Sequence, residues 1–162
     1  MKLSSLLSGA VNCAIVISIA TLASARAADV EKFVKSFSDD DRYCIQQNVY
    51  FEARNESMLG QASVAWVTLN RWKSEKFPND VCDVVWQRKQ FSWTHDGKSD
   101  RPKEIEAWER AGRVVKMVLE DYAWGREDPT AGATHYHATY VKPYWVASLS
   151  EIKKIGTHIF YK

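Results

Sequence analysis

Apolar residues recur at helical spacing in three stretches of the chain, and this pattern predicts three helices. The first covers about residues 39–54 and begins with three consecutive aspartates, which suit the cap and first turn of a helix. The second covers about residues 59–73, and the third starts near Pro102 and ends before Gly125. Three tryptophans on the apolar stripes are expected in the core: Trp66, Trp72 and Trp108.

After Gly125, turn residues and short alternating runs replace the helical spacing. Residues 133–140 alternate as a strand does, and residues 154–161 are expected to form a final short strand. The fold class is therefore predicted to be α+β, mainly helical with a small antiparallel sheet near the C-terminus.

The N-terminal residues carry no charge between Leu3 and Ala25, with a basic residue on either side. The run ends in two overlapping A-x-A patterns, which would place a cleavage site after Ala25 or Ala27. Residues 1–27 are therefore predicted to be a secretory signal peptide, and residues 28–162 a single domain exported to the periplasm or the extracellular space. The alternative is a retained but weak membrane anchor, because the uncharged run is just long enough to span a bilayer.

Export changes the meaning of the charges and cysteines. The chain has 22 basic and 20 acidic residues, and removal of Lys2 and Arg26 leaves 20 of each. A neutral domain gives no sign of the basic face that nucleic acid binding needs. Cys13 leaves with the signal peptide, so Cys44 and Cys82 are predicted to form a disulfide in an oxidising compartment. The alternative is a pair of buried free thiols.

One carboxylate is placed where it could do chemistry. Three apolar residues share one face of the first predicted helix: Ile45, Val49 and Ala53. Glu52 falls between them at 100° per residue, so burial should raise its pKa towards the range that a general acid needs. A structural salt bridge to Arg54 or Arg71 is the alternative, and spacing alone leaves both interpretations open.

Several separated motifs resemble those of the SleB/CwlJ-type cell wall hydrolases, over about residues 43–162. They are residues 50–57 (YFEARNES), 60–61 (GQ), 69–71 (LNR), 77–79 (FPN), 90–93 (QFSW), 96–97 (DG) and 132–138 (GATHYHA). The resemblance implies a lysozyme-like fold and cleavage of the glycan strand between N-acetylmuramic acid and N-acetylglucosamine, in some members by lytic transglycosylation. It also implies that the catalytic acid is the glutamate of the Glu-Ala-Arg motif, which is Glu52 here.

One position departs from the family pattern. Members commonly carry glycine after the Glu-Ala-Arg motif, and this chain has Asn55. We expect Asn55 to take a left-handed conformation that ends the helix, since asparagine tolerates that conformation best after glycine.

A single catalytic carboxylate favours the transglycosylase reaction over hydrolysis. A hydrolysing glycosidase normally needs two carboxylates, whereas a transglycosylase can use the 6-hydroxyl of the muramyl residue as nucleophile. The candidates for a second carboxylate are Glu56, one helical turn after Glu52, and Asp96. A hydrolytic muramidase is therefore the alternative.

Sugar binding needs flat apolar faces and a few hydrogen-bonding groups. Trp93, Tyr144 and Trp145 fall in predicted loops, where exposed aromatic residues are often functional. The expected polar contributors are Gln90, Asp96, His135, Tyr136 and His137. Some of these residues are expected to serve packing only. We expect a monomer that binds peptidoglycan and needs no cofactor.

Two other functions compete with the glycosidase. His135 and His137 share one face of a predicted strand, so with His95 or an acid they could hold zinc in a metal-dependent amidase or peptidase. The chain has no HExxH motif to support that site. A non-catalytic peptidoglycan-binding module is the third interpretation, against which the complete Glu52 motif argues.

Overall fold

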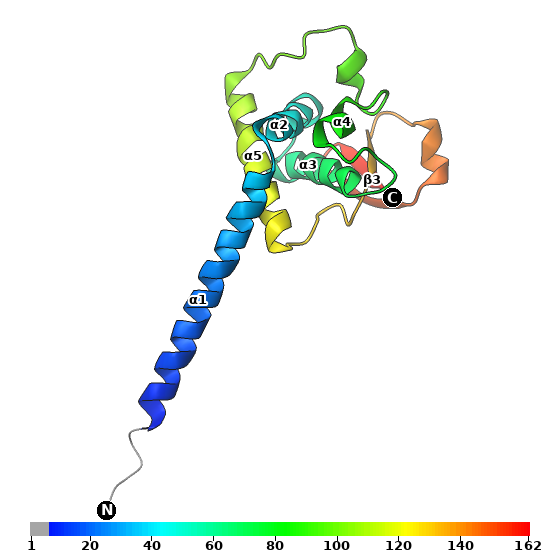
Figure 1. Ribbon diagram of the computed structural model, residues 1–162. Coiled ribbons are helices and arrows are strands. Elements are labelled where there is room, and N and C mark those ends of the chain that lie inside the picture. Colours follow the sequence, from blue (N-terminus) through cyan, green and yellow to red (C-terminus); the bar gives the residue numbers. More distant parts are fainter. Residues whose placement is uncertain (1–6) are drawn as a thin grey trace, which may run out of the picture.

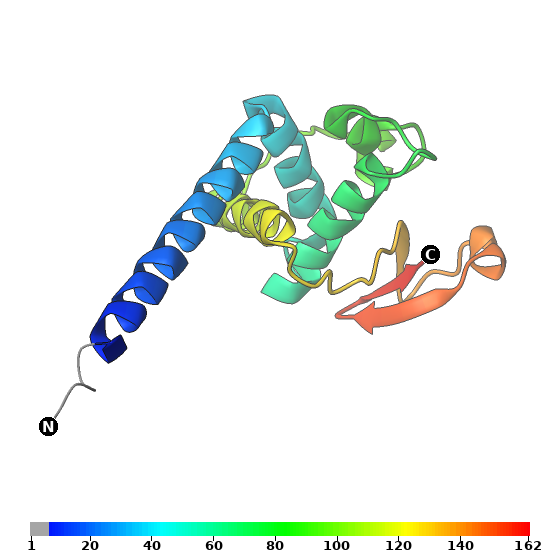
Figure 2. The ribbon, with the colours of Figure 1, turned by 60° about the horizontal axis from the view of Figure 1, so that its bottom comes forward.

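The computed structural model describes residues 7–162, and their side chains from residue 21 onward. A long helix projects from a helical body, and a small sheet lies on the side of that body away from the helix (Figures 1 and 2). The helices are α1 (Leu7–Ser36), α2 (Asp39–Ala53), α3 (Met58–Trp72), α4 (Val81–Trp86) and α5 (Ile105–Trp124). Two short 3-10 helices, η1 (Ser92–His95) and η2 (Tyr144–Ser148), and three strands, β1 (His135–Ala138), β2 (Glu151–Ile155) and β3 (His158–Tyr161), complete the fold. The predicted α+β class is confirmed.

The core lies between α2, α3 and α5, the three helices that the apolar spacing predicts. Val49 of α2, Leu69 of α3 and Leu119 of α5 are fully buried there. Trp66 is also buried, whereas two other tryptophans, Trp72 and Trp108, are half-buried at the margin of the core. The predicted core location is therefore confirmed for Trp66 and holds in part for the other two.

The bounds of α2 follow the prediction, but the conformation expected just after its C-terminal end does not. Ser38 caps the helix in a capping box, since its side chain accepts from the backbone of Asp41 and the Asp41 carboxylate accepts from the backbone of Ser38. At the other end Asn55 is not left-handed, because Lys89 and Ala131 are the non-glycine residues with positive φ among those described. The backbone of Glu56 instead donates to the Ala53 carbonyl and closes a turn.

The third predicted helix begins later than expected. Pro102 does not occupy its first turn, and α5 starts at Ile105, which is 74% exposed. The hydroxyl of Tyr50 accepts hydrogen bonds from the backbones of Lys103 and Glu104, which holds this stretch outside the helix. The C-terminal end is as predicted, with Gly125 in the left-handed conformation at φ 69°.

The sheet is antiparallel, with strand order β1-β3-β2. The alternation over residues 133–140 yields the shorter strand β1. The prediction of one strand over residues 154–161 is wrong, because the chain turns at Gly156, where φ is 57°, and forms the β2–β3 hairpin. The helix α4 was not predicted, since six residues are too few to display a helical period.

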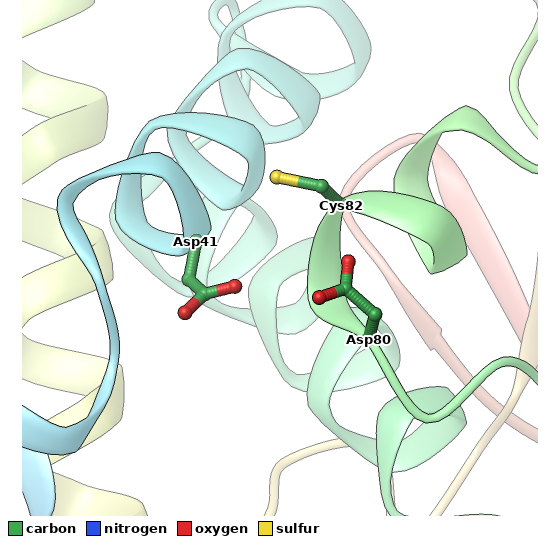
Figure 3. Close-up of side chains that lie close together, drawn as sticks. All are labelled: Asp41, Asp80 and Cys82. Carbon is green, nitrogen blue, oxygen red and sulfur yellow. The ribbon is translucent and has the colours of Figure 1, made fainter.

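Cys44 of α2 and Cys82 of α4 form the disulfide that the sequence predicts, with an S–S distance of 2.06 Å. The Cys82 sulfur points towards α2 and lies near two carboxylates, those of Asp41 and Asp80 (Figure 3). This group is no metal site, because the sulfur is bonded to Cys44 and each carboxylate caps a helix. Asp41 belongs to the capping box of α2, and Asp80 accepts from the backbone of Asp83 at the start of α4.

The predicted signal peptide overlaps α1, and its residues 1–6 lie outside the described residues. Within the described part of the chain, no helix is both long enough and apolar enough to cross a membrane. The C-terminal half of α1 packs against α5, where Phe33 stacks on Tyr122 with ring centroids 5.4 Å apart.

Candidate active site

An open cleft of about 890 Å³ lies where the C-terminal end of α2 meets the sheet. One wall consists of α2 residues together with η1 and the loop that leads to α5. The opposite wall consists of β1, the first residue of β3 and the segment before and within η2. The cleft therefore joins the two parts of the fold, and its lining residues come from distant parts of the sequence.

Glu52 lies in this cleft on the last turn of α2. Its Oε2 accepts a hydrogen bond of 3.2 Å from the hydroxyl of Tyr136 on β1. Burial raises the pKa of Glu52 from its ordinary value of 4.5 to about 7, while the Tyr136 hydrogen bond and the charge of Arg71 act in the opposite direction. The rise in pKa that the sequence predicts is therefore confirmed. At neutral pH the carboxyl group can both give and take a proton.

Neither arginine proposed as a salt-bridge partner forms an ion pair with Glu52. Arg54 pairs with Glu104 at 3.0 Å, and the Nε of Arg71 donates to the Thr134 carbonyl at 2.6 Å. The structural salt bridge considered from the sequence is therefore wrong.

Arg71 lies behind the cleft as a buried cation, with 3% of its surface exposed. Its guanidinium is 5.3 Å from the ring centre of Phe77 and 4.9 Å from that of Phe91. Burial lowers the pKa of Arg71 to about 10, and the residue still carries its positive charge at neutral pH. Its hydrogen bond to Thr134 fixes the backbone two residues before Tyr136, so Arg71 helps to orient the hydroxyl that reaches Glu52.

Tyr136 connects the catalytic candidate to the sheet. Its ring contacts Phe91, His158 and Phe160, with centroids 6.3, 5.1 and 5.5 Å away. Burial raises the pKa of Tyr136 well above its ordinary value, so the hydroxyl stays protonated and donates to Glu52.

The structure brings six of the eight predicted sugar-binding residues to the cleft: Gln90, Trp93, Asp96, Tyr136, His137 and Trp145. The other two lie outside its lining. His135 contacts Phe77 and Trp145, and Tyr144 is 95% exposed on η2.

Trp93 is not the exposed loop residue that the sequence suggests. Only 6% of its surface is exposed, its ring stacks on Phe51 at 4.8 Å, and its indole nitrogen donates to Asn48. A helical turn, η1, turns this side chain inward. Trp93 therefore forms part of the cleft wall, and most of its face is covered by protein.

The two candidates for a second carboxylate differ in position. Glu56 accepts hydrogen bonds from the backbone and the hydroxyl of Thr157, so it anchors the β2–β3 turn and lies outside the cleft lining. Asp96 lines the cleft and lies 3.5 Å from Lys98.

The histidines considered as zinc ligands do not come together in a metal site. His137 shares a 3.0 Å hydrogen bond with the Tyr161 hydroxyl through its Nε2. Among the side chains that the structure describes, the group of metal-ligating atoms close enough to hold an ion contains no histidine. Neither His135 nor His95 therefore joins His137 in a metal site.

Sequence reasoning missed His158, which lines the cleft beside Tyr136. It stands at the turn of an unpredicted hairpin, and its single imidazole carries no local motif. The hydrogen bond between Tyr136 and Glu52 could not be predicted either, because 84 positions separate the two residues.

Comparisons with known proteins identify the family of the chain. A sequence model described as Cell Wall Hydrolase matches residues 55–161. The chain belongs to this family. The resemblance seen in the motifs is thereby confirmed.

Relatives of this cell wall hydrolase include two spore cortex-lytic enzymes. That of Halalkalibacterium halodurans is 36% identical over 137 residues, which cover 82% of this chain and 39% of the relative. That of Bacillus subtilis strain 168 is 34% identical over 126 residues, which cover 76% of this chain and 38% of the relative. The chain thus spans about two fifths of the length of these curated relatives.

Two solved structures have the same fold. The catalytic domain of the Bacillus cereus SleB protein gives a TM-score of 0.65 at 34% identity, with 78% of this chain and 92% of that chain covered. The catalytic domain of SleB from Bacillus anthracis, described as a germination-specific lytic transglycosylase, gives 0.64 at 35% identity, with 78% and 97% covered. The similarity therefore covers nearly all of each catalytic domain.

Proposed function

We propose that this cell wall hydrolase is a lytic transglycosylase that cleaves peptidoglycan between N-acetylmuramic acid and N-acetylglucosamine. The observation that carries the proposal is the environment of Glu52, an open cleft in which the carboxyl group is held by Tyr136 at a pKa of about 7. The family match begins at Asn55, three residues after Glu52, so the role of this carboxyl rests on its geometry and its motif.

The reaction uses Glu52 twice. The protonated carboxyl donates its proton to the glycosidic oxygen as the bond from that oxygen to C1 of the muramyl residue breaks. The resulting carboxylate then removes the proton from the muramyl 6-hydroxyl, whose oxygen attacks C1 and forms a 1,6-anhydro ring. Glu52 is protonated again at the end, and no water is consumed. Tyr136 keeps the carboxyl in place through both steps.

The engagement of the other carboxylates supports transglycosylation over hydrolysis. Glu56 is bound to the hairpin, Glu104 pairs with Arg54 and Asp96 pairs with Lys98. A hydrolytic muramidase would have to recruit its base from Asp96, Asp100 or Glu104 in the cleft lining. The lytic transglycosylase activity of the similar Bacillus anthracis domain favours the same choice.

We further propose that the protein acts outside the cytoplasm, with residues 1–27 serving as a removable signal peptide. Its substrate is external to the cytoplasm, and a disulfide such as Cys44–Cys82 forms in oxidising compartments. A monomer with no stable membrane insertion after cleavage, and with no affinity for nucleic acid, completes the proposal.

Mass spectrometry of digested peptidoglycan tests the reaction. We expect the purified protein to release muropeptides with 1,6-anhydromuramic ends, and the Glu52→Gln variant to release none. Reducing muramic ends would identify a muramidase and freed stem peptides an amidase, and either product would overturn the transglycosylase assignment.

A further inference from the structure

His158 is a cleft residue for which the described part of the chain supplies no hydrogen-bonding partner. It is the first residue of β3, it lines the cleft, and only 6% of its surface is exposed. Its ring meets Tyr136 edge to face at 5.1 Å and Phe160 at 6.3 Å. Polar side chains buried to this degree are nearly always hydrogen-bonded, so an unpartnered one that lines a cleft is suited to bind a molecule held there.

The two ring nitrogens of His158 have different surroundings. Nδ1 is sealed from solvent and has no partner. Nε2 makes no hydrogen bond within the described residues and is not sealed from solvent, and the residue itself lines the cleft. The same sheet offers a contrast in His137, whose Nε2 is paired with the Tyr161 hydroxyl.

Burial also determines which nitrogen carries the proton. Burial lowers the pKa of His158, with the charge of Glu56 opposing and that of His137 reinforcing the change, so the ring is neutral at pH 7. A neutral imidazole has one N–H donor and one acceptor nitrogen. A buried lone pair is more readily left without a partner than a buried N–H, which favours the tautomer with the proton on Nε2 and the lone pair on the sealed Nδ1.

We propose that His158 is a substrate-binding residue, whose Nε2–H donates a hydrogen bond to an acceptor oxygen of the glycan bound next to Glu52. Tyr136 links the two residues, since its hydroxyl binds Glu52 and its ring supports the imidazole. An oxygen of a sugar hydroxyl or acetamide group supplies the missing acceptor. The inference rests on the proposed function, because it assumes that the cleft holds a glycan strand.

Three substitutions test this role. His158→Phe keeps a ring against Tyr136 and removes the donor, whereas His158→Gln places an amide N–H near the position of Nε2. His95→Gln is the matched control, because His95 is exposed on η1 and outside the cleft lining. Each protein is assayed for kcat and KM on soluble glycan strands and for its thermal midpoint.

Loss of one hydrogen bond at the site should reduce kcat/KM about tenfold to a hundredfold in His158→Phe, with the thermal midpoint kept. His158→Gln should remain within about threefold to fivefold of the wild type if the amide restores the bond, and His95→Gln should match the wild type. Wild-type activity in His158→Phe would overturn the inference, as would an equal loss in His158→Gln.

A binding experiment separates this inference from the proposed function. In a Glu52→Gln background, calorimetry with a tetrasaccharide of N-acetylglucosamine should give about tenfold weaker affinity after His158→Phe. Equal affinities, or no binding by the Glu52→Gln parent, would overturn the inference. A wild-type protein that releases no anhydromuramic ends would defeat the proposed function alone, since the affinity ratio would still report on His158.

Discussion

The last turn of α2 and the part of the helix before it lie in contrasting surroundings. Around Val49 the helix packs against α3 and α5 in a core made mostly of apolar side chains. One turn further on, Glu52 enters a cleft where an acid, a phenol and a buried cation lie close together. Burial stabilises the first region through the hydrophobic effect, and in the second it disfavours charge and so shifts pKa values.

This difference indicates that one part of α2 mainly stabilises the fold, whereas its last turn carries the residue that takes part in the reaction. Buried polar atoms without partners occur near the cleft, such as Nη1 of Arg71 and Nδ1 of His158. The disulfide, the capping box and the apolar core fix the earlier part of α2. If the division is real, substitutions in the two parts should affect different measurements.

The largest effect is expected at Glu52. Glu52→Gln removes the proton donor but keeps the size of the side chain, so release of soluble muropeptides should fall by about a thousandfold or more. The thermal midpoint at neutral pH should not fall. Glu109→Gln serves as the control carboxylate, since Glu109 is exposed on α5 and lies outside the cleft lining, and it should retain the activity. Activity within tenfold of wild type after Glu52→Gln would remove Glu52 from the acid role.

The disulfide tests the earlier part of the helix. Replacing both Cys44 and Cys82 with alanine opens a loop closed over a sequence separation of 38. Chain entropy predicts a loss of about 3 to 4 kcal/mol in the free energy of unfolding, as an upper value. Denaturant titration measures the loss, and kcat per folded molecule should stay near the wild-type value. Two alkylatable thiols in the exported protein would contradict the predicted bond.

The helical body could be predicted from the sequence because its structure depends on local repetition. The periodic apolar residues of α2 and α3 located these helices to within about one residue. The start of α5 was misplaced because the hydroxyl of Tyr50, more than fifty residues earlier, binds the backbone before Ile105. Local pattern contains no information about such a contact.

Glu52 and six of the eight expected sugar-binding residues of the cleft could be named from the sequence, but the contacts between them could not. Glu52 could be identified because it lies on the apolar side of its helix and belongs to the Glu-Ala-Arg motif of the family. Its partners lie far away in sequence, Tyr136 on β1 and His158 on an unpredicted hairpin, so spacing could not bring them together. Trp93 was placed wrongly for a related reason, because the Phe51 ring that covers it belongs to another element.

The pH dependence of stability gives a finer test of the contrast. Glu52 holds its proton up to a pKa of about 7 in the folded protein and 4.5 when unfolded. Between these values the folded state retains a proton that the unfolded state has lost, so the wild type loses stability as pH rises. Glutamine does not titrate, and Glu52→Gln should therefore exceed the wild type by about 2 to 3 kcal/mol at pH 8 and by nothing below pH 4. Parallel stability curves from pH 4 to 8 would contradict the raised pKa.

The smallest expected effect concerns the hydrogen bond between Tyr136 and Glu52. Tyr136→Phe keeps the ring against His158 and Phe160 but removes the hydroxyl that lowers the pKa of Glu52. Since burial then acts with less opposition, the pKa should rise, and the alkaline limb of the activity profile should move up by about half a unit to one unit. Activity at the optimum should fall only about threefold to tenfold, because the acid itself remains.

Tyr161→Phe is the matched control, because it removes a hydroxyl that is hydrogen-bonded to His137 and not to Glu52. It should leave the alkaline limb in place. A limb that stays in place in Tyr136→Phe as well would mean that the phenol does not influence the proton on Glu52. A limb that moves down would mean that Tyr136 hydrogen-bonds the protonated carboxyl more strongly than the carboxylate. Only an upward shift of the alkaline limb that is confined to Tyr136→Phe would show that the contact between α2 and β1 sets the pKa of Glu52.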